Sequence, residues 1–224
     1  MCGGRGTRLE SAREKPLYPI GGLAMVDRVL RALAESHLER TYAVVSPHAP
    51  ETRAHLEAAG VALLETPGEG YVADLVSALA DERVDTPVLT VAADLPLLER
   101  AVIDRVLEVY ERDCGRGDGG RVGEAGSPRE GPSMTVCVPT ALKRRLGVSR
   151  ETTLEQERQL APTGVNVVGN GEKSREMRHT SYDPRLAINV NRPEDARVAE
   201  TTTGTMEREY EREGGDVERD TRCE

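Results

Sequence analysis

Short apolar runs alternate with stretches of helical periodicity along the first two hundred residues, and this alternation constrains the fold more than any other feature. We expect strands at 41–46, 61–65, 87–93, 134–139, 165–168 and 186–190, and helices at 24–36, 50–59, 71–79, 98–110, 140–146 and 193–200. Regular alternation of this kind predicts an α/β protein whose sheet is mostly parallel, with right-handed crossovers.

A glycine-rich stretch, Cys2 to Leu17, precedes the first expected helix. Glycine lets the backbone bring its N–H groups up to phosphate oxygens, so the cluster predicts a phosphate cradle. A hydroxyl and cations that suit a triphosphate follow within the same stretch. The spacing matches neither GxGxxG nor a P-loop, and a flexible leader is the alternative interpretation. The residues concerned are Gly3, Gly4, Gly6, Thr7, Arg8, Arg13 and Lys15.

Only Met1 precedes this loop. Ligand-binding loops of open α/β sheets follow the carboxyl end of a strand, so roughly five residues of a first, central strand are expected before it. Either the true start lies upstream, which we favour, or the sheet is completed in another way.

Composition narrows the possible partners. The formal charge is −9 and the 30 basic residues include only three lysines, while Phe and Trp are absent. An acidic surface argues against nucleic acid as a partner. Neither a membrane-spanning run nor a leader pattern is present, so we expect a cytoplasmic protein. The balance of charges resembles that of proteins from salt-loving archaea, although a GC-rich genome alone could account for the excess of arginine over lysine. The four cysteines and four histidines lack metal-ligand spacing.

Three further places could carry chemistry, and two of them supply possible metal ligands. Asp94 follows the apolar run 87–93, where this fold class puts a ligand for Mg²⁺, although a helix N-cap is the alternative. Asn189 and Asn191 would point to one face of a strand and could assist a metal or phosphate, although paired asparagines are more often turn or capping residues.

The segment 67–75 places Gly68 and Gly70 before a helix that starts near Tyr71 and contains Asp74. Free N–H groups at that helix start would face the same end of the sheet as the glycine-rich loop. A plain turn would give the same pattern.

These motifs together resemble a known family. GGxGTRL followed by KPL is similar to the signature of nucleotidyltransferases with a Rossmann-like fold of the nucleotide-diphospho-sugar transferase type. This family includes sugar-phosphate nucleotidylyltransferases and molybdenum cofactor guanylyltransferases. GxGYxxDL in 68–75 and TGVNVVG in 163–169 are more similar to the archaeal adenosylcobinamide-phosphate guanylyltransferases. The resemblance covers about residues 2 to 200.

The resemblance implies an enzyme that moves GMP from GTP to adenosylcobinamide phosphate with release of pyrophosphate, in cobalamin biosynthesis. It gives Arg8, Lys15 and Asp94 catalytic roles, and makes Asp94, Asn189 and Asn191 the ligands of Mg²⁺. Nucleotide binding would fall to Cys2, Gly3, Gly4, Gly6, Thr7, Arg8, Lys15, Gly68, Gly70, Tyr71, Asp74 and Asp94.

Alternatives stay open: a molybdenum cofactor or sugar-phosphate nucleotidylyltransferase, or a nucleotide-binding module without turnover. A homodimer is compatible with the sequence. We expect one domain over 1–200 with a flexible glycine-rich loop at 114–132, and a charged tail at 201–224 that is disordered apart from one weak helical turn around 206–213.

Overall fold

The computed structural model describes residues 1–2, 9, 11, 13–114, 131–149, 159–169 and 176–217, with side chains described up to residue 205. The expected flexible loop at 114–132 lies almost wholly outside the described residues. The strands are β1 (Pro19–Ile20), β2 (Leu23–Ala24), β3 (Tyr42–Val45), β4 (Ala62–Glu65), β5 (Val88–Val91), β6 (Met134–Pro139), β7 (Leu160–Val168) and β8 (Met177–Thr180). The helices are η2 (Lys15–Leu17), α1 (Met25–Glu35), α2 (Pro50–Ala58), α3 (Tyr71–Leu79), α4 (Arg100–Cys114), α5 (Thr140–Leu146), η3 (Pro184–Leu186) and α6 (Pro193–Val217).

The main strands run mostly in one direction. β3 pairs with β4 in parallel, and β6 pairs with β8 in parallel. β5 and β6 each pair antiparallel with β7, so they are parallel to one another, and among the described strands of this four-stranded sheet β7 alone is reversed. The expected α/β fold with a mostly parallel sheet is therefore confirmed, with β3–β4 and β5–β7–β6–β8 as two separate units and β1–β2 as a small hairpin.

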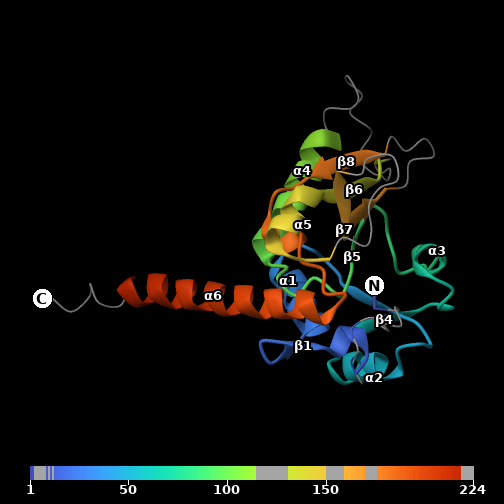
Figure 1. Cartoon of the computed structure of the whole chain (residues 1–224). Coiled ribbons are helices and arrows are strands. Elements are labelled where there is room, and N and C mark those ends of the chain that lie inside the picture. Colours follow the sequence, from blue (N-terminus) through green and yellow to red (C-terminus); the bar gives the residue numbers. More distant parts are fainter. Residues whose placement is uncertain are drawn as a thin grey trace, which may run out of the picture.

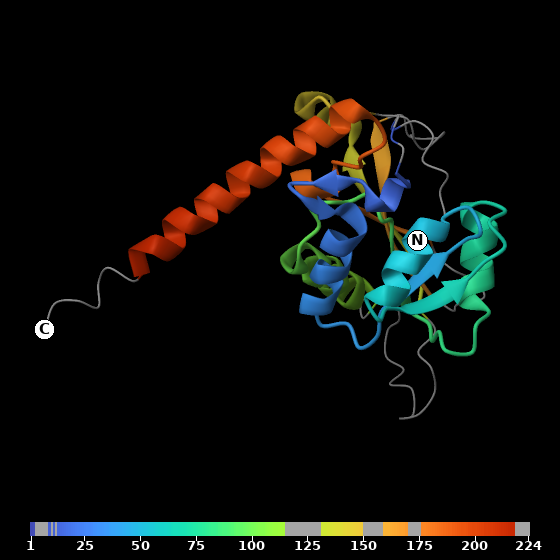
Figure 2. The same cartoon turned by 90° about the horizontal axis from the view of Figure 1, so that it is seen from below.

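Helices cover both sides of the strands (Figures 1 and 2). α1 and α4 lie together on one side, and α3 lies on the other. The main core forms where α4 and α1 meet the inner strands, and branched aliphatic residues supply it, as expected of a chain without Phe or Trp. Its members include Val29, Val102, Val106, Val136 and Val165.

Most expected elements are present within a few residues of the predicted bounds, and the hairpin β1–β2 was not predicted, but three other differences are larger. The run 186–190 is not a strand: Pro184 starts the 3₁₀ turn η3, and the chain beyond it bonds to a loop, through the Val190 N–H and the Asp94 carbonyl (3.0 Å). The strand β8 was missed because MRHT shows no apolar alternation.

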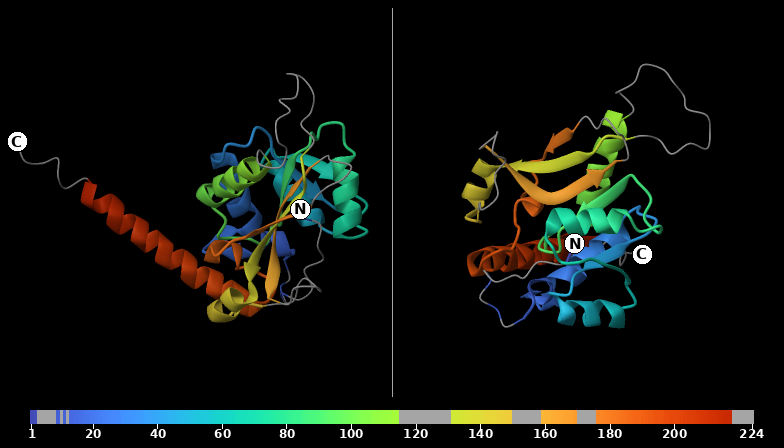
Figure 3. Two further views of the ribbon diagram at one scale, coloured as in Figure 1. Left: turned by 90° about the horizontal axis from the view of Figure 1, so that it is seen from above. Right: turned by 90° about the vertical axis from the view of Figure 1, so that its right-hand side faces the viewer.

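The third error concerns the end of the chain. α6 continues to Val217, so the disorder expected from residue 201 is wrong for 201–217, while 218–224 lie outside the described residues. No proline interrupts this stretch, and its threonine hydroxyls bond to carbonyls one turn back, as Thr203 does to Ala199 (2.9 Å). α6 projects from the body of the molecule (Figures 1 and 3).

Candidate active site

Asp94 and Lys15 form the centre of the candidate site. Asp94 follows β5, and Lys15 opens the turn η2 at the end of the glycine-rich stretch. The Lys15 Nζ donates to Asp94 Oδ2 at 2.6 Å, and the two side chains are only 17% and 18% exposed. Two residues that are 79 positions apart are thus held together at the carboxyl end of β5, the edge where open α/β sheets bind ligands.

The two asparagines join this pair from the segment before α6. Lys15 Nζ also donates to Asn191 Oδ1 (2.7 Å), and Asn189 Nδ2 donates to Asp94 Oδ1 (3.1 Å) and to the Thr163 carbonyl (2.8 Å). Both acceptors of Asn189 Nδ2 are oxygens that cannot donate, so the amide orientation is fixed. The structure therefore brings Lys15, Asp94, Asn189 and Asn191 into one network, while their roles in catalysis and metal binding stay predictions.

Lys143, on α5, lies behind this network and was not singled out from the sequence. Its Nζ donates to Asn189 Oδ1 (3.0 Å) and to the Ala187 carbonyl (2.8 Å), and the residue is 5% exposed. Burial lowers the pKa of Lys143, while the charges of Asp94 and Asp195 act in the opposite direction. Because its oxygen faces this ammonium, Asn189 is placed to orient Asp94, whereas the metal role expected for it would need that same oxygen.

Asp195 anchors the asparagine segment to the start of α6. Its fully buried carboxylate accepts from the backbone N–H groups of Asn191 (3.0 Å) and Arg192 (2.9 Å). It also accepts from the Ser149 N–H (2.7 Å) and hydroxyl (2.8 Å). An acidic residue in the first helical turn that reaches back in this way satisfies donors the helix leaves unpaired. Asn191 is thereby held in position from its own backbone.

Glu14 fixes the other side of Lys15. Its carboxylate accepts from the backbone N–H groups of Glu51 (2.9 Å) and Thr52 (2.7 Å) at the start of α2. A carboxylate at a helix N-terminus satisfies free donors and complements the helix dipole. The residue before Lys15 is thus tied to a helix, which limits where the ammonium can go.

Gly164 lets β7 pass close to the end of β5. Its φ is +84°, and its carbonyl accepts from the Ala92 N–H (2.9 Å). An added Cβ would lie 2.8 Å from the Ala92 Cβ, two residues from Asp94. A side chain at this position would have to displace the strand end that carries Asp94.

We therefore expect Gly164→Ala to destabilise the protein more than Gly60→Ala does. Gly60 has a similar positive φ of +72°, but a Cβ added there would meet nothing within 4 Å, so both variants share the backbone strain and only Gly164→Ala adds a clash. The difference in free energy of unfolding should be about 2 kcal/mol, measured by urea denaturation. Equal losses in the two variants would contradict this close approach.

The glycine and helix segment 67–75 forms a tight loop. The Asp74 carboxylate, 5% exposed, accepts from the Gly68 N–H (2.8 Å), and Gly68 and Gly70 have φ of +78° and +116°. The Tyr71 hydroxyl accepts from Asn166 Nδ2 on β7 (3.2 Å). In this arrangement Asp74 holds the loop and Tyr71 links α3 to β7, and their nucleotide roles stay predictions.

The glycine-rich loop itself is only partly described. Gly3, Gly4, Gly6, Thr7 and Arg8 lie outside the described residues, so their predicted contacts with phosphate stay predictions. Cys2 is buried in the core with Val26 and Ala43, so its thiol packs among apolar side chains.

The oxygen atoms at this site are of the type that binds Mg²⁺. Within the described part of the chain no group of three or more acidic, cysteine or histidine side chains could hold a metal ion. Mg²⁺ at a nucleotide site is commonly bound by one or two carboxylates and the substrate phosphates, which Asp94 could satisfy with help from the Asn191 amide oxygen. Since Lys15 now occupies the acceptors on both residues, binding of the ion would require the ammonium to shift.

Comparison with known proteins identifies the family. The family model for the MobA-like NTP transferase domain matches residues 1–161. The chain belongs to this family. It is accordingly an enzyme of the nucleotidyltransferase type, and Lys15 and Asp94 lie within the matched residues.

Individual relatives share between a quarter and a third of their residues with this chain over the aligned regions. Adenosylcobinamide-phosphate guanylyltransferase of Methanocaldococcus jannaschii is 25% identical over 207 residues, which cover 89% of this chain and 93% of that protein. The bifunctional protein GlmU of Gloeobacter violaceus is 31% identical over 113 residues, which are 49% of this chain but only 25% of that protein.

Solved structures agree on the fold. A CMP:2-keto-3-deoxy-manno-octonic acid synthetase complexed with CTP superposes with a TM-score of 0.56 at 14% identity, covering 89% of this chain and 96% of that one. A hypothetical transferase from Thermus thermophilus gives a TM-score of 0.52 at 18% identity, covering 81% and 90%. At these identities the likeness concerns the fold alone.

Among the described residues, no helix is both long and apolar enough to span a membrane.

Proposed function

We propose that this nucleotidyltransferase moves GMP from GTP to adenosylcobinamide phosphate and releases pyrophosphate, as a step of cobalamin biosynthesis. The observation that carries the proposal is the similarity to the M. jannaschii guanylyltransferase along nearly the whole of both chains. The network of Lys15, Asp94 and Asn191 at the carboxyl end of β5 supports it, because it offers the groups a triphosphate needs at the edge of the sheet where ligands bind.

In the proposed reaction an ionised phosphate oxygen of the acceptor attacks the α-phosphorus of GTP in line. The bond between that oxygen and the α-phosphorus forms, and the bond from the α-phosphorus to the oxygen that bridges to the β-phosphorus breaks. Pyrophosphate leaves with the bonding electron pair. The acceptor needs no general base since it is already an anion, so catalysis consists of positioning and of neutralising charge.

Lys15 is the described residue best placed to neutralise that charge. Its ammonium is held by two acceptors, Asp94 Oδ2 and Asn191 Oδ1, and an incoming triphosphate oxygen could replace either as its partner. We propose that Lys15 and Arg8 bind the leaving pyrophosphate and that the glycine loop orients the phosphates. Asp94 and Asn191 would hold Mg²⁺, which supplies charge neutralisation at the phosphate oxygens when bound.

The sequence leaves two other acceptor classes to test. Matches to GlmU proteins cover about half of this chain at about 30% identity, which keeps a sugar phosphate acceptor under consideration. Membership of the MobA-like family keeps the molybdenum cofactor under consideration as well. A binding module without turnover would contradict the enzyme class of the family.

Pyrophosphate release tests these possibilities together. We expect release with GTP, Mg²⁺ and adenosylcobinamide phosphate all present, and none when the acceptor is left out or when EDTA removes the metal. ATP, CTP and UTP are the matched nucleotides, and N-acetylglucosamine 1-phosphate and the molybdenum cofactor are the matched acceptors. The assay is run at high and low salt, because the acidic composition predicts a salt requirement.

Each contrary result has a defined meaning. Pyrophosphate release with another acceptor would show that the proposed acceptor is wrong and that the reaction type, nucleotidyl transfer, is right. Preference for another nucleotide would overturn the guanylyl assignment. GTP binding without release under any of these conditions would point to an acceptor outside this set or to a binding module without turnover.

A further inference from the structure

A short linking segment, residues 46–52, runs from the end of β3 into the first turn of α2 and contacts two parts of the candidate nucleotide site. One part is the turn that carries Lys15. The other is the loop at 67–75, between β4 and α3. The linking segment contacts the first through Glu14 and the second through His48. These contacts connect the two parts of the site through a third piece of chain.

Glu14 connects the Lys15 turn to the linking segment. The residue before α2, Ala49, makes no side-chain bond to the free N–H groups of the helix. The Glu14 carboxylate, 37 positions away, accepts from two of them instead (2.9 and 2.7 Å). The Glu14 carbonyl accepts from the Leu17 N–H (2.9 Å), a bond that closes the turn around Lys15. One residue thus holds that turn by its backbone and α2 by its side chain.

His48 connects the linking segment to the loop 67–75. Its Nε2 lies 3.2 Å from the Gly68 carbonyl, and because a carbonyl can only accept, Nε2 carries the hydrogen and donates. The approach is close, since a Cβ added at Gly68 would lie 3.0 Å from His48 Cδ2 and 3.2 Å from the Ser46 Cβ. Asp74 accepts from the Gly68 N–H (2.8 Å). Gly68 is therefore held through its N–H and through its carbonyl.

The linking segment has little freedom to change its length. Pro47 fixes one φ angle, and the Ala49 N–H donates to the Ser46 carbonyl (3.2 Å), which closes a turn. Where the segment leaves β3, the Val45 carbonyl accepts from the N–H (2.9 Å) and the hydroxyl (3.1 Å) of Thr66, which follows β4. The segment is thus anchored at the ends of both strands.

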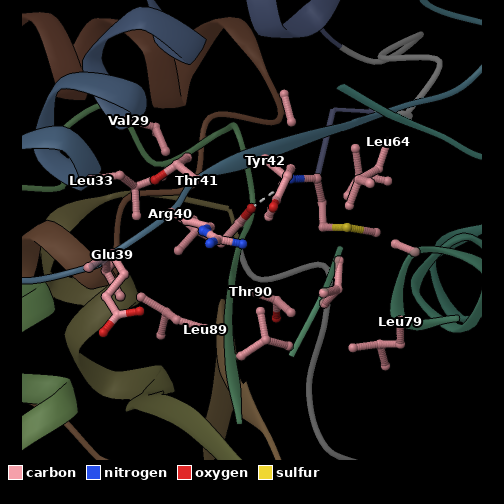
Figure 4. Close-up of a pocket in the computed structure, with 18 of the residues that line it drawn as sticks. Val29, Leu33, Glu39, Arg40, Thr41, Tyr42, Leu64, Leu79, Leu89 and Thr90 are labelled. Carbon is pink, nitrogen blue, oxygen red and sulfur yellow. Dashed lines mark hydrogen bonds between the residues drawn. The ribbon is translucent and has the colours of Figure 1, made fainter. Parts of the chain in front are cut away.

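The linking segment lies outside the cavity shown in Figure 4. That cavity has a volume of about 550 Å³, and the side chains that line it include Tyr42, Leu64 and Thr90 of β3, β4 and β5. Neither Glu14 nor His48 is among the described residues that line it. The contacts of the linking segment belong instead to the carboxyl ends of β3 and β4, the edge where open α/β sheets bind ligands.

We propose that the linking segment sets the spacing between the phosphate side and the nucleoside side of the GTP site, with Glu14 and His48 as positioning residues at its two ends. The inference rests on the proposed use of GTP, with its phosphates at Lys15 and its nucleoside at the loop 67–75. GTP spans both sides, so its affinity depends on a spacing that is fixed before binding. A fragment of GTP that occupies one side does not depend on that spacing.

The test compares GTP with two of its fragments, tripolyphosphate and guanosine, on the full-length protein. Each displaces a fluorescent GTP analogue at one fixed concentration of free Mg²⁺. The variants are Glu14→Ala, His48→Ala and the two combined. Glu51→Ala is the matched control, because Glu51 is an exposed acidic residue on the same turn of α2 and alanine keeps its N–H. His48→Gln is the conservative variant, because its amide restores a donor for the Gly68 carbonyl.

Either single alanine variant should bind GTP about 10-fold more weakly, while both fragments bind as they do to the parent protein. The double variant should also lose about 10-fold and not about 100-fold, because a segment released at one end no longer fixes the spacing. Glu51→Ala and His48→Gln should keep the parent affinity for GTP.

Four results would overturn the inference while leaving the proposed function in place. Unchanged GTP affinity in both single variants would show that the spacing is set elsewhere. Fragment binding that weakens in step with GTP would assign the two residues to ligand contact or to stability. A 100-fold loss in the double variant would make their effects independent. A parent protein that binds GTP but neither fragment would lack two separate sides. A parent protein that binds no GTP would instead contradict the proposed function, and this inference with it.

Discussion

Replacing Asp94 by Asn should lower kcat for pyrophosphate release about a thousandfold. The substitution keeps the shape of the side chain but removes the negative charge that pairs with Lys15 at 2.6 Å and that would hold a metal ion. Charge placed in advance at the reacting phosphates commonly contributes two to three orders of magnitude to rate, and loss of a metal ligand adds to this. Some GTP binding should persist, because other groups hold the phosphates. Steady-state kinetics and equilibrium GTP binding measure the two quantities separately.

Asp104→Asn is the matched control. Asp104 is exposed to the same degree, 19% against 18%, and also pairs with a cation, Arg100, but it lies on α4 outside the candidate site. Its replacement should change neither kcat nor GTP binding. Unchanged turnover in Asp94→Asn would remove Asp94 from the reaction, and an equal loss in both variants would show a general effect on stability.

The sequence predicted the position of Asp94 because the rule behind that prediction is geometric. Asp94 was expected to follow a buried strand, and the carboxyl ends of parallel strands meet at one edge of a sheet. Any residue that follows such a strand is therefore near the ligand edge, whatever its distance along the chain. Asp94, which follows β5, bonds there to Lys15 and Asn189, which lie 79 and 95 positions away along the chain.

The position of Lys143 behind the site could not be predicted from the order of the strands. In TALKRRL it is one of three consecutive basic residues on a short helix, a pattern typical of an exposed face. Its burial depends on the Ala187 carbonyl and the Asn189 amide, which arrive 44 and 46 positions later in the chain. The end of the helical chain was missed for a related reason, because the polar composition past 200 predicts disorder and gives no sign of the backbone bonds that continue α6.

The sequence also predicted the role of Asn189 only in part. Strand alternation predicted that Asn189 and Asn191 would share a face, whereas the segment is not a strand and the two amides bond to different partners. Asn191 presents its oxygen to Lys15. Asn189 presents its nitrogen to Asp94 and its oxygen to Lys143, so the orientation of the Asp94 carboxylate depends on a buried cation behind it.

Lys143→Met should therefore lower kcat about 30-fold while the free energy of unfolding falls by no more than about 2 kcal/mol. Two buried oxygens lose a donor, which destabilises the fold, but removal of a desolvated charge offsets part of that loss. Turnover suffers more because the Asn189 amide is no longer fixed, and loss of such supporting contacts commonly costs about 10- to 100-fold. The Michaelis constant for GTP should change little. Kinetics and urea denaturation measure the two effects, with Arg144→Met, an exposed cation on the same helix, as the control.

A double-mutant cycle separates positioning from a general loss of structure. If Lys143 acts on Asp94 through Asn189, then Lys143→Met should cost almost nothing further in a protein that already carries Asn189→Ala, because the group it orients is gone. Two losses that simply multiply would mean that Lys143 acts on turnover by another route. A loss in kcat that tracks unfolding across both single variants and Arg144→Met would assign Lys143 to stability alone. Coupling of the two losses would connect a buried ammonium to the carboxylate at the ligand edge through one amide side chain.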